Sequence, residues 1–246
     1  MIAVSAIILA KDEEATIPDC VASLKGLDEI IVIDTGSGDG TIAIATRCGA
    51  RVLSERWQGF GVQRQQALRH ARNDWVLFLD ADERLSPALL AAVRSLEPEA
   101  DGYDLRRKNY FLGKPMRNGR WANDWQLRLF DKRKAAVAPV AVHESVTITG
   151  RTERLDGGFI EHHTDPTIEK YLNKLNRYTA LEADQKIADG RCYSTVKMLF
   201  DPFAEFWKLY LVLGGWRDGL RGLALAGLSA LYKLSVQGKL LERSRG

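Results

Sequence analysis

The segment VSAIILAKDEE, residues 4–14, sets a short, isoleucine-rich apolar run directly before a polar stretch. The same order recurs in EIIVIDTGSGDG, residues 29–40, and in WVLFLDADE, residues 75–83. Amphipathic stretches with helical spacing accompany these runs, at residues 16–24, 41–48 and 61–71. Apolar strands that alternate with helices predict a parallel sheet covered on both faces. The expected fold class is therefore α/β, with a Rossmann-like, mostly parallel sheet flanked by helices.

Polar residues follow each of the three apolar runs, at positions 11–14, 34–39 and 80–83. Ligands of parallel sheets bind in the crevice at the carboxyl ends of the strands. We therefore expect these three segments, which are far apart in the sequence, to line one crevice.

The composition indicates which binding partners and which cellular compartment to expect. The chain has 246 residues, 46% of them hydrophobic, and a formal net charge of +3 at pH 7. This length allows a substantial core, and the charge is too small to indicate a nucleic-acid partner. The three cysteines, Cys20, Cys48 and Cys192, have no CxxC spacing. We therefore expect neither a disulfide framework nor a zinc site, and the first residues lack the features of a signal peptide, so a cytoplasmic protein is predicted.

The sequence DADE, residues 80–83, follows the third apolar run directly. Two carboxylates spaced one residue apart at a strand end, Asp80 and Asp82, converge on one side and can ligate a divalent cation. Mg²⁺ and Mn²⁺ prefer oxygen ligands, and Mg²⁺ commonly combines one or two carboxylates with substrate phosphates. The alternative is a solvated turn in which Asp82 or Ser86 caps a helix that begins at Pro87.

Taken together, the three segments resemble glycosyltransferase family 2, in which an SxIIxxxNEE-like opening, a VDDGSxDGT-like turn and a DxD motif recur. In this chain they read SAIILAKDEE, IDTGSGDGT and DADE. Two departures are Asp12, where the opening usually has asparagine, and Thr35, where the turn usually has a second aspartate. The resemblance implies a GT-A fold, a nucleotide-sugar donor and a divalent metal, Mg²⁺ or Mn²⁺, that holds the donor diphosphate.

The resemblance also assigns residues to the donor. It implies that Ala10, Glu13 and Asp34 line the nucleoside pocket, that Arg64 reaches the base or a phosphate, and that Asp80 and Ala81 contact the donor. Two alternatives are open. Arg64 could be a surface arginine of its helix, and the nearby Asp39 is better explained as the N-cap of the following helix than as a ligand.

A middle stretch, GKPMRNGRWANDWQLRLF at residues 113–130, is followed by VHE at residues 142–144. This pair looks like the lipopolysaccharide-core β-glucosyltransferase branch of the family, in which these segments occupy the acceptor side. The branch implies transfer of glucose from UDP-glucose to a lipopolysaccharide inner core or related glycolipid. The implied acceptor-binding residues are Trp121, Trp125, Arg128 and His143. Galactose, N-acetylhexosamine or heptose stay open as donor sugars, as do the metal preference and the oligomeric state.

Inversion at the sugar carbon requires a carboxylate that deprotonates the acceptor hydroxyl. Glu144 is the preferred candidate, and Asp124, between two tryptophans, is the other. Either could instead form a salt bridge with Arg128 or Arg151. His162 is expected to complete the metal site, because imidazole can ligate Mn²⁺, although a hydrogen-bonded histidine is the commoner case.

Two other classes of protein compete with the transferase. Sugar-nucleotide nucleotidyltransferases share this topology, but they typically begin with a glycine-rich phosphate loop, and residues 5–14 contain no glycine. A non-catalytic, membrane-associated scaffold with a decayed site is the second alternative, and the intact acidic residues argue against it.

The tail from residue 200 carries seven Lys and Arg residues against four Asp and Glu, with apolar and aromatic residues at helical spacing. No uncharged run reaches the roughly 18 residues of a spanning helix. We expect an amphipathic extension that lies on an anionic membrane, on the inner face of the cytoplasmic membrane. A helical hairpin packed on the catalytic domain, or a dimer interface, is the alternative. The predicted domains are a GT-A catalytic domain (1–165, with 1–100 for the donor and 101–165 for the acceptor) and a helical extension (166–246).

Overall fold

The computed structural model describes residues 2–137, 146–163 and 167–244. The chain divides into two compact units. Unit 1 comprises Met1–Lys108 and Asp124–His162, and unit 2 comprises Asn109–Asn123 and His163–Gly246. The boundary between His162 and His163 lies close to the predicted division at residue 165, but unit 2 also takes in residues 109–123. The assignment of donor and acceptor roles to parts of the chain stays a prediction.

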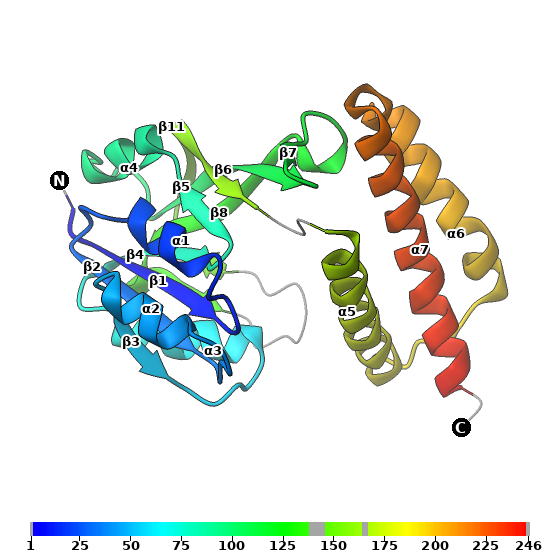
Figure 1. Cartoon of the computed structure of the whole chain (residues 1–246), viewed down its shortest axis with the longest axis horizontal. Coiled ribbons are helices and arrows are strands. Elements are labelled where there is room, and N and C mark those ends of the chain that lie inside the picture. The colour runs from blue at the N-terminus through cyan, green and yellow to red at the C-terminus, as the bar shows by residue number, and fades with distance from the viewer. Residues whose placement is uncertain (1, 138–145, 164–166, 245–246) are drawn as a thin grey trace. The chain divides into compact units, whose positions relative to one another are not determined.

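The N-terminal half of unit 1 is the predicted parallel sheet (Figure 1). Its strands run in the order β3-β2-β1-β4. Their bounds are β1 Val4–Ala10, β2 Glu29–Asp34, β3 Arg51–Ser54 and β4 Trp75–Asp80. The helices are α1 Ile17–Ser23, α2 Thr41–Arg47, α3 Phe60–Ala67 and α4 Pro87–Arg94, with a 3₁₀ turn, η1, at Leu68–His70. The α/β fold class is confirmed.

Burial on both faces explains why the central strands are mainly apolar. Ile7 and Ile8 are adjacent on β1, so their side chains point to opposite faces of the sheet. Ile8 belongs to a core cluster that includes Val21 of α1 and Leu89 of α4, and Ile7 belongs to a second cluster that includes Ala67 of α3. A polar residue inside such a strand needs a hydrogen-bond partner, as Ser5 of β1 shows: it is fully buried and its hydroxyl donates to Glu29 Oε2 at 2.7 Å.

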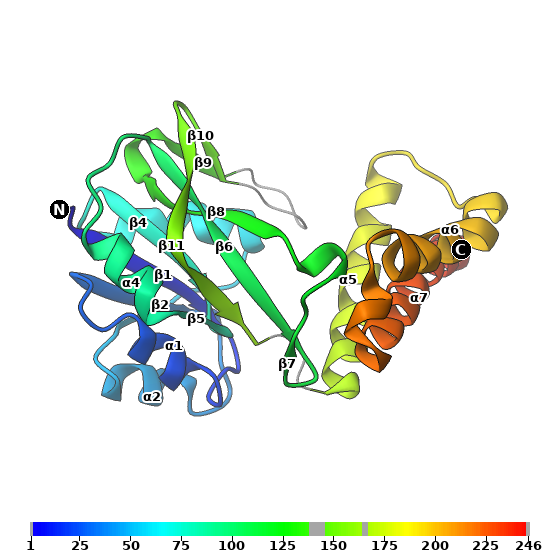
Figure 2. The ribbon, with the colours of Figure 1, turned by 90° about the horizontal axis from the view of Figure 1, so that it is seen from above.

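The second half of unit 1 extends the sheet with antiparallel strands. The path continues β4-β8-β6-β11-β5, and Figure 2 shows β8, β6 and β11 side by side. The bounds are β5 Glu83–Leu85, β6 Gly102–Phe111, β8 Asp124–Asp131 and β11 Thr152–His162. A separate pair, β9 Ala135–Val137 and β10 Val146–Ile148, follows the 3₁₀ turn η3 at Lys132–Lys134. Ser86 caps α4 by accepting the N–H of Leu89, as the sequence allowed.

Unit 2 is mainly helical. It contains β7 Lys114–Pro115, which pairs with the end of β6, and η2 Gly119–Trp121. Its helices are α5 Ile168–Ala188, α6 Thr195–Trp207 and α7 Leu220–Arg243, with a π-helical turn η4 at Lys208–Val212 and a 3₁₀ turn η5 at Gly215–Asp218. The expected amphipathic helical extension is therefore present.

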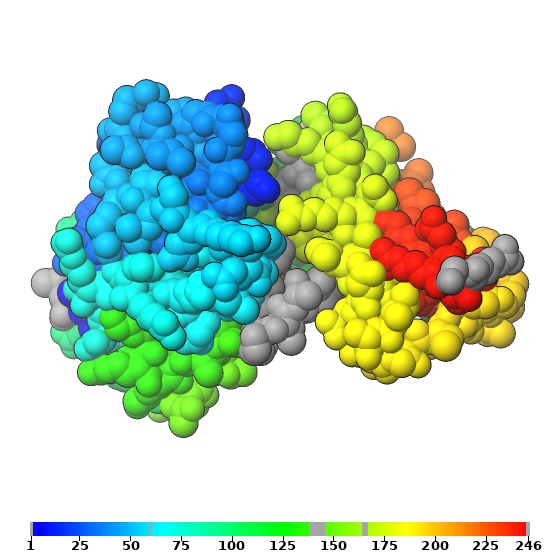
Figure 3. All heavy atoms as spheres, turned by 90° about the horizontal axis from the view of Figure 1, so that it is seen from below, coloured from blue at the N-terminus to red at the C-terminus, as the bar shows by residue number. Residues whose placement is uncertain are grey.

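Helices α5 and α7 are held together by a small core and by polar contacts. Ala183, Val236 and Leu240 form the core cluster. Figure 3 shows the red end of α7 against the yellow residues of α5, where Arg243 donates to the Ala180 carbonyl at 3.0 Å and pairs with Asp184 at 2.8 Å. Within the described ranges, no helix is long and apolar enough to cross a membrane.

Candidate functional site

The loops after β1 and β2 are joined by hydrogen bonds in both directions. Backbone N–H groups of Asp12, Glu13 and Glu14 donate to side chains of the second loop, and those of Gly38 and Gly40 donate back to side chains of the first. Asp12 has a φ of 56°, a left-handed conformation that Asn and Asp adopt more readily than other non-glycine residues. Its Oδ1 accepts the Gly38 N–H at 2.7 Å. An aspartate here supplies the acceptor oxygen that an asparagine would supply, so this departure from the family motif leaves the loop intact.

Two predicted nucleoside-pocket residues, Ala10 and Asp34, are register partners at the ends of β1 and β2, and both are buried. Asp34 accepts three hydrogen bonds from the turn that follows it: Gly36 N at 3.0 Å, Ser37 N at 3.1 Å and Ser37 Oγ at 2.5 Å. The Ala10 carbonyl accepts the Thr35 N–H at 3.0 Å. These bonds fix the shape of the turn, and contact with a nucleobase stays a prediction.

Glu13 and Asp39 both hold the start of a helix. The Glu13 carboxylate accepts the Thr16 hydroxyl at 2.6 Å, directly before α1. Asp39 Oδ1 accepts the Thr41 N–H at 3.0 Å, at the first residue of α2. The predicted N-cap role of Asp39 is wrong by one residue, because the N-cap position is Gly40 and the carboxylate reaches past it.

Asp80, at the end of β4, is held by two arginines. Arg64 Nη2 lies 2.7 Å from Asp80 Oδ1, and Arg128 Nη2 lies 2.9 Å from Asp80 Oδ2. Burial would raise the pKa of Asp80, but Arg128 and Arg64 hold that pKa well below the usual range of an aspartate. Asp80 is therefore ionised, and an arginine next to each of its carboxylate oxygens balances its negative charge. The Arg64 side chain is only 13% exposed, so it is not a surface arginine.

Glu83 is fully buried next to Asp80 and Arg128. Its Oε2 accepts the Asp80 N–H at 3.0 Å, and its Oε1 lies 3.0 Å from Arg128 Nη2 and 3.3 Å from Arg107 Nη1. Burial lowers the pKa of Arg128, but Glu83 and Asp80 outweigh it and raise that pKa, so the guanidinium stays charged. Arg128 was predicted to bind the acceptor. Its observed contacts are with Asp80 and Glu83, and an acceptor contact stays a prediction.

Asp82 and His162 come together from the turn after β4 and from the end of β11. Asp82 Oδ2 lies 3.4 Å from His162 Nε2, and the two side chains are mostly buried. The β11–β5 register, in which His162 is opposite Glu83, explains this proximity. Ala81, between the two aspartates, is buried. The structure therefore brings together Asp82 and His162, two of the three predicted metal-binding residues. The third, Asp80, precedes Asp82 by two positions in the chain.

The two aspartates at the end of β4 suit a metal ion that is also bound by the phosphates of the nucleotide-sugar. Among the residues described, no group of three or more His, Cys, Asp or Glu side chains is arranged to hold an ion alone. Mg²⁺ is usually bound by one or two carboxylates together with substrate phosphates and water. Asp80 and Asp82 provide such a pair, and phosphate oxygens of a donor would complete it.

The other predicted acceptor-side residues have separate surroundings. Asp124 Oδ2 lies 2.7 Å from Arg107 Nε, so Arg107 is a salt-bridge partner that the sequence did not indicate. Arg154 stacks over the Trp125 ring at 4.9 Å in unit 1. Trp121 belongs to unit 2, where its ring meets Phe111 edge to face. His143 and Glu144 lie outside the described residues.

Sequence reasoning missed the central roles of Glu83 and Arg107. Glu83 was visible in the DADE motif, but nothing in the sequence distinguishes a buried glutamate from a solvated one. Arg107 is on β6, and its two carboxylate partners lie 24 and 17 positions away. Only the strand pairing brings these three residues together, so no local sequence signal was available.

Comparison with known proteins relates the chain to glycosyltransferases. Residues 5–156 match the model of the family described as glycosyl transferase family 2. The lipopolysaccharide core biosynthesis glycosyltransferase LpsC of Rhizobium meliloti is 31% identical, over 97% of this chain and 92% of its own length. An uncharacterized glycosyltransferase of Rickettsia typhi is 27% identical, over 98% of this chain and 87% of its own.

Solved structures match only part of the chain. Glucosyl-3-phosphoglycerate synthase from Mycobacterium tuberculosis, in complex with Mn²⁺, UDP and phosphoglyceric acid, is 29% identical. The match covers 45% of this chain and 43% of that one, with a TM-score of 0.34.

The family match extends over more than half of the chain and contains all three motif segments. The relationship to LpsC extends over nearly all of it. The chain is therefore a glycosyltransferase, and it belongs to glycosyl transferase family 2.

Proposed function

We propose that the protein is an inverting hexosyltransferase that uses a divalent metal, Mg²⁺ or Mn²⁺, to move glucose from UDP-glucose onto a lipopolysaccharide inner core or related glycolipid. One observation carries the proposal. The ionised Asp80, fixed between Arg64 and Arg128, stands beside Asp82 and His162 at the carboxyl end of β4. The loops after β1 and β2, which carry the motifs of the nucleoside pocket, follow the neighbouring strands of the same sheet.

The chain's own residues prepare this strand end for a diphosphate. Arg128 is buried and holds Asp80 in one orientation, so the carboxylate needs no rearrangement when a ligand arrives. His162 orients Asp82 in the same way. A divalent ion between these carboxylates and the donor would neutralise the charge that develops on the departing UDP.

The identities of the proposed donor sugar and acceptor are inferred from similarity to other proteins. LpsC is a lipopolysaccharide core biosynthesis glycosyltransferase, and its likeness to nearly the whole chain supports an acceptor of that class. Glucose follows from the branch that residues 113–144 resemble. A thermal-shift panel of nucleotide sugars, with and without Mn²⁺, would distinguish glucose from galactose, N-acetylhexosamine and heptose donors.

Metal removal should abolish tight donor binding. Without a cation, the phosphate oxygens lose the ion that would link them to Asp80 and Asp82, so we expect the affinity for UDP measured by calorimetry to fall at least tenfold when EDTA replaces Mn²⁺. Asp82→Asn should weaken binding in Mn²⁺ similarly. Asp19→Asn, which removes an exposed carboxylate paired with Arg84, is the charge-matched control and should bind as the wild type does. Unchanged affinity in EDTA would refute the metal proposal.

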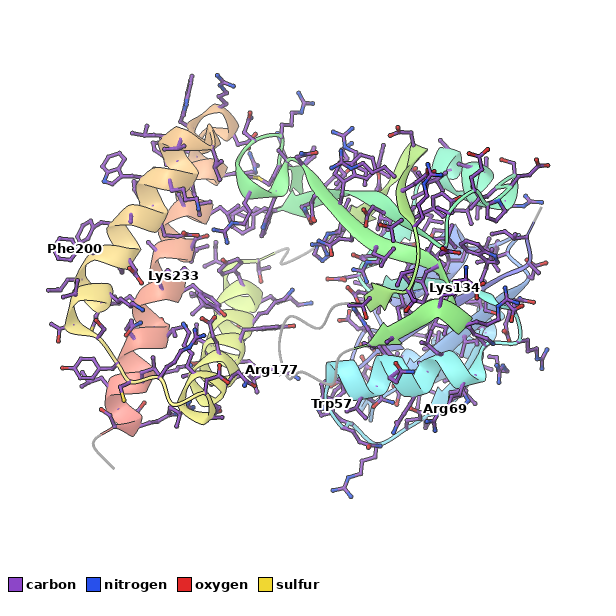
Figure 4. The ribbon with its side chains drawn as sticks, turned by 180° about the vertical axis from the view of Figure 1, so that it is seen from behind. Trp57, Arg69, Lys134, Arg177, Phe200 and Lys233 are labelled. Carbon is purple, nitrogen blue, oxygen red and sulfur yellow. The ribbon has the colours of Figure 1, made fainter. Side chains whose placement is uncertain are left out.

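We also propose that unit 2 binds the surface of an anionic membrane through one face of α6. Residues spaced three or four apart along α6 and η4 expose their apolar side chains: Val196, Leu199, Phe200, Phe203, Trp207 and Leu211. Phe200 and Phe203 are 66% and 68% exposed, and Figure 4 shows Phe200 on the side of α6 that faces away from α7. Lys197, Asp201 and Lys208 each follow a residue of this face by one position, about 100° around the helix, so all three border it on the same side with a net charge of +1. An apolar face with a net basic border suits in-plane binding to anionic lipid.

Replacing aromatic residues of this face should release the protein from vesicles. We expect Phe203→Ser to weaken sedimentation with vesicles rich in phosphatidylglycerol about tenfold, because burying a phenylalanine contributes about 1.5–3 kcal/mol. Its melting temperature should hardly change, since the ring is exposed already. Ile187→Ser, at an exposed apolar residue on α5, is the matched control. If both variants bind like the wild type, this face does not contact the membrane.

A further inference from the structure

A small, basic pocket lies within unit 2, apart from every residue assigned to the donor. Its volume is about 210 Å³, and it is lined by Lys114, Pro115, Met116, Arg117, Asp218 and Arg221. Pockets for drug-sized ligands are about 300–1,000 Å³, so this one suits a single small chemical group.

Three cations face this pocket without a carboxylate partner. In the part of the chain that the structure describes, Lys114, Arg117 and Arg221 form no ion pair. The Nε of Arg221 is also inaccessible to water and has no hydrogen-bond partner. Because Nε is closed to solvent, an anion in the pocket would be bound by the terminal Nη groups of the Arg221 guanidinium, as charge-assisted hydrogen bonds require.

The one carboxylate of the pocket is already occupied. Asp218 accepts hydrogen bonds from Arg117 N at 3.2 Å and from Asn118 N at 2.9 Å, and Asn118 Nδ2 donates to it at 3.2 Å. These bonds orient Asp218 toward the loop after β7 but leave its charge in place, so the three cations and one carboxylate give the pocket lining a net charge of +2. The pocket as a whole favours an anion.

Tight backbone contacts fix the wall that carries Arg221. A Cβ on Gly222 would lie 1.8 Å from the Gly215 carbonyl oxygen, and a Cβ on Gly215 would lie 2.7 Å from the Leu209 carbonyl oxygen. Only glycine allows α7 to begin so close to η5. On the other wall, Leu112 and Gly113 both have positive φ, 48° and 72°, in a two-residue hairpin turn that ends at Lys114. Both walls are therefore set by backbone geometry and not by flexible side chains.

We propose that this pocket binds a phosphate group, carried either by a lipid headgroup or by a soluble phosphate compound. The guanidinium of Arg221 is the principal donor, because it is partly buried and forms no ion pair with the described residues. Lys114 and Arg117, both exposed, add charge at the rim. The inference does not depend on the transferase reaction, since no residue of the pocket belongs to the donor site.

Two probes test the pocket and distinguish the sources. Calorimetry of the full-length protein in EDTA would measure binding of inorganic phosphate and of dihexanoylphosphatidic acid, a soluble lipid with a phosphate monoester. EDTA suppresses metal-dependent binding at the donor site, so a result here is separate from the proposed function. Affinity for the lipid at least tenfold above that for phosphate assigns the pocket to a headgroup, and equal affinities assign it to free phosphate.

Variants establish that the pocket is the site. We expect Arg221→Gln to weaken binding of the tighter probe about tenfold or more, because it removes a charge-assisted hydrogen bond. Lys114→Gln should weaken it severalfold, and this exposed position keeps the test valid if Arg221→Gln lowers the melting temperature. Arg191→Gln removes an exposed cation of the same unit away from the pocket and should have no effect. Absence of binding by either probe at millimolar concentration, or equal affinities for Lys114→Gln and Arg191→Gln, would overturn the proposal.

Discussion

Arg128→Met is expected to lower the free energy of unfolding by about 3–5 kcal/mol, the typical result of removing one partner from a buried ion pair. The Arg128 side chain is 6% exposed, and Glu83 is wholly buried. Without the guanidinium, Glu83 keeps only Arg107, at 3.3 Å, among its arginine partners, and Asp80 keeps only Arg64. Folded proteins are stable by about 5–15 kcal/mol, so a loss of this size should be plain in a urea titration.

A surface pair supplies the control. Arg84→Met breaks an ion pair with Asp19 whose side chains are 33% and 57% exposed, and it should cost less than about 1 kcal/mol. Adding Glu83→Leu to Arg128→Met should recover part of the loss, because it removes the stranded carboxylate. Equal urea midpoints for the Arg128 and Arg84 variants would show that the buried network does not stabilise unit 1.

Glu144→Gln is expected to lower kcat by about a hundredfold or more while leaving the affinity for UDP unchanged, because a general base contributes about 10²–10⁴ to the rate. The amide keeps the size of the side chain and removes only proton acceptance. Steady-state kinetics with saturating donor, together with calorimetry of UDP, would separate these two effects.

Asp124→Asn is the comparison variant. Asp124 is already paired at 2.7 Å with Arg107, a contact that joins β8 to β6, and it accepts from Gln126 of its own strand at 2.7 Å. We expect its replacement to reduce stability more than turnover. An inactive Asp124 variant beside an active Glu144 variant would reverse the assignment of the base.

The pattern of the sequence was sufficient for the parallel half of the fold. Ile7, Ile8 and their counterparts on β2 and β4 are apolar on both sides of each strand, and a strand of that kind is stable only between two layers of helices. The polar residues that end these strands must then meet at one edge. Asp34 and Asp80 could therefore be placed at the candidate site, because both requirements act within a few residues along the chain.

The sequence did not indicate which side chains contact these residues. Arg64, Arg128 and Glu83 surround Asp80 from three separate elements, and Arg128 arrives through the antiparallel pairing of β8 with β4. Likewise, Lys114 and Arg221 meet at one pocket from positions more than a hundred residues apart. Hydrophobic periodicity specifies which face of an element is buried, and it carries no information on which charged side chains of other elements will face it. Strand register and the close contact of Gly222 with Gly215 supply that information, and both exist only in the folded chain.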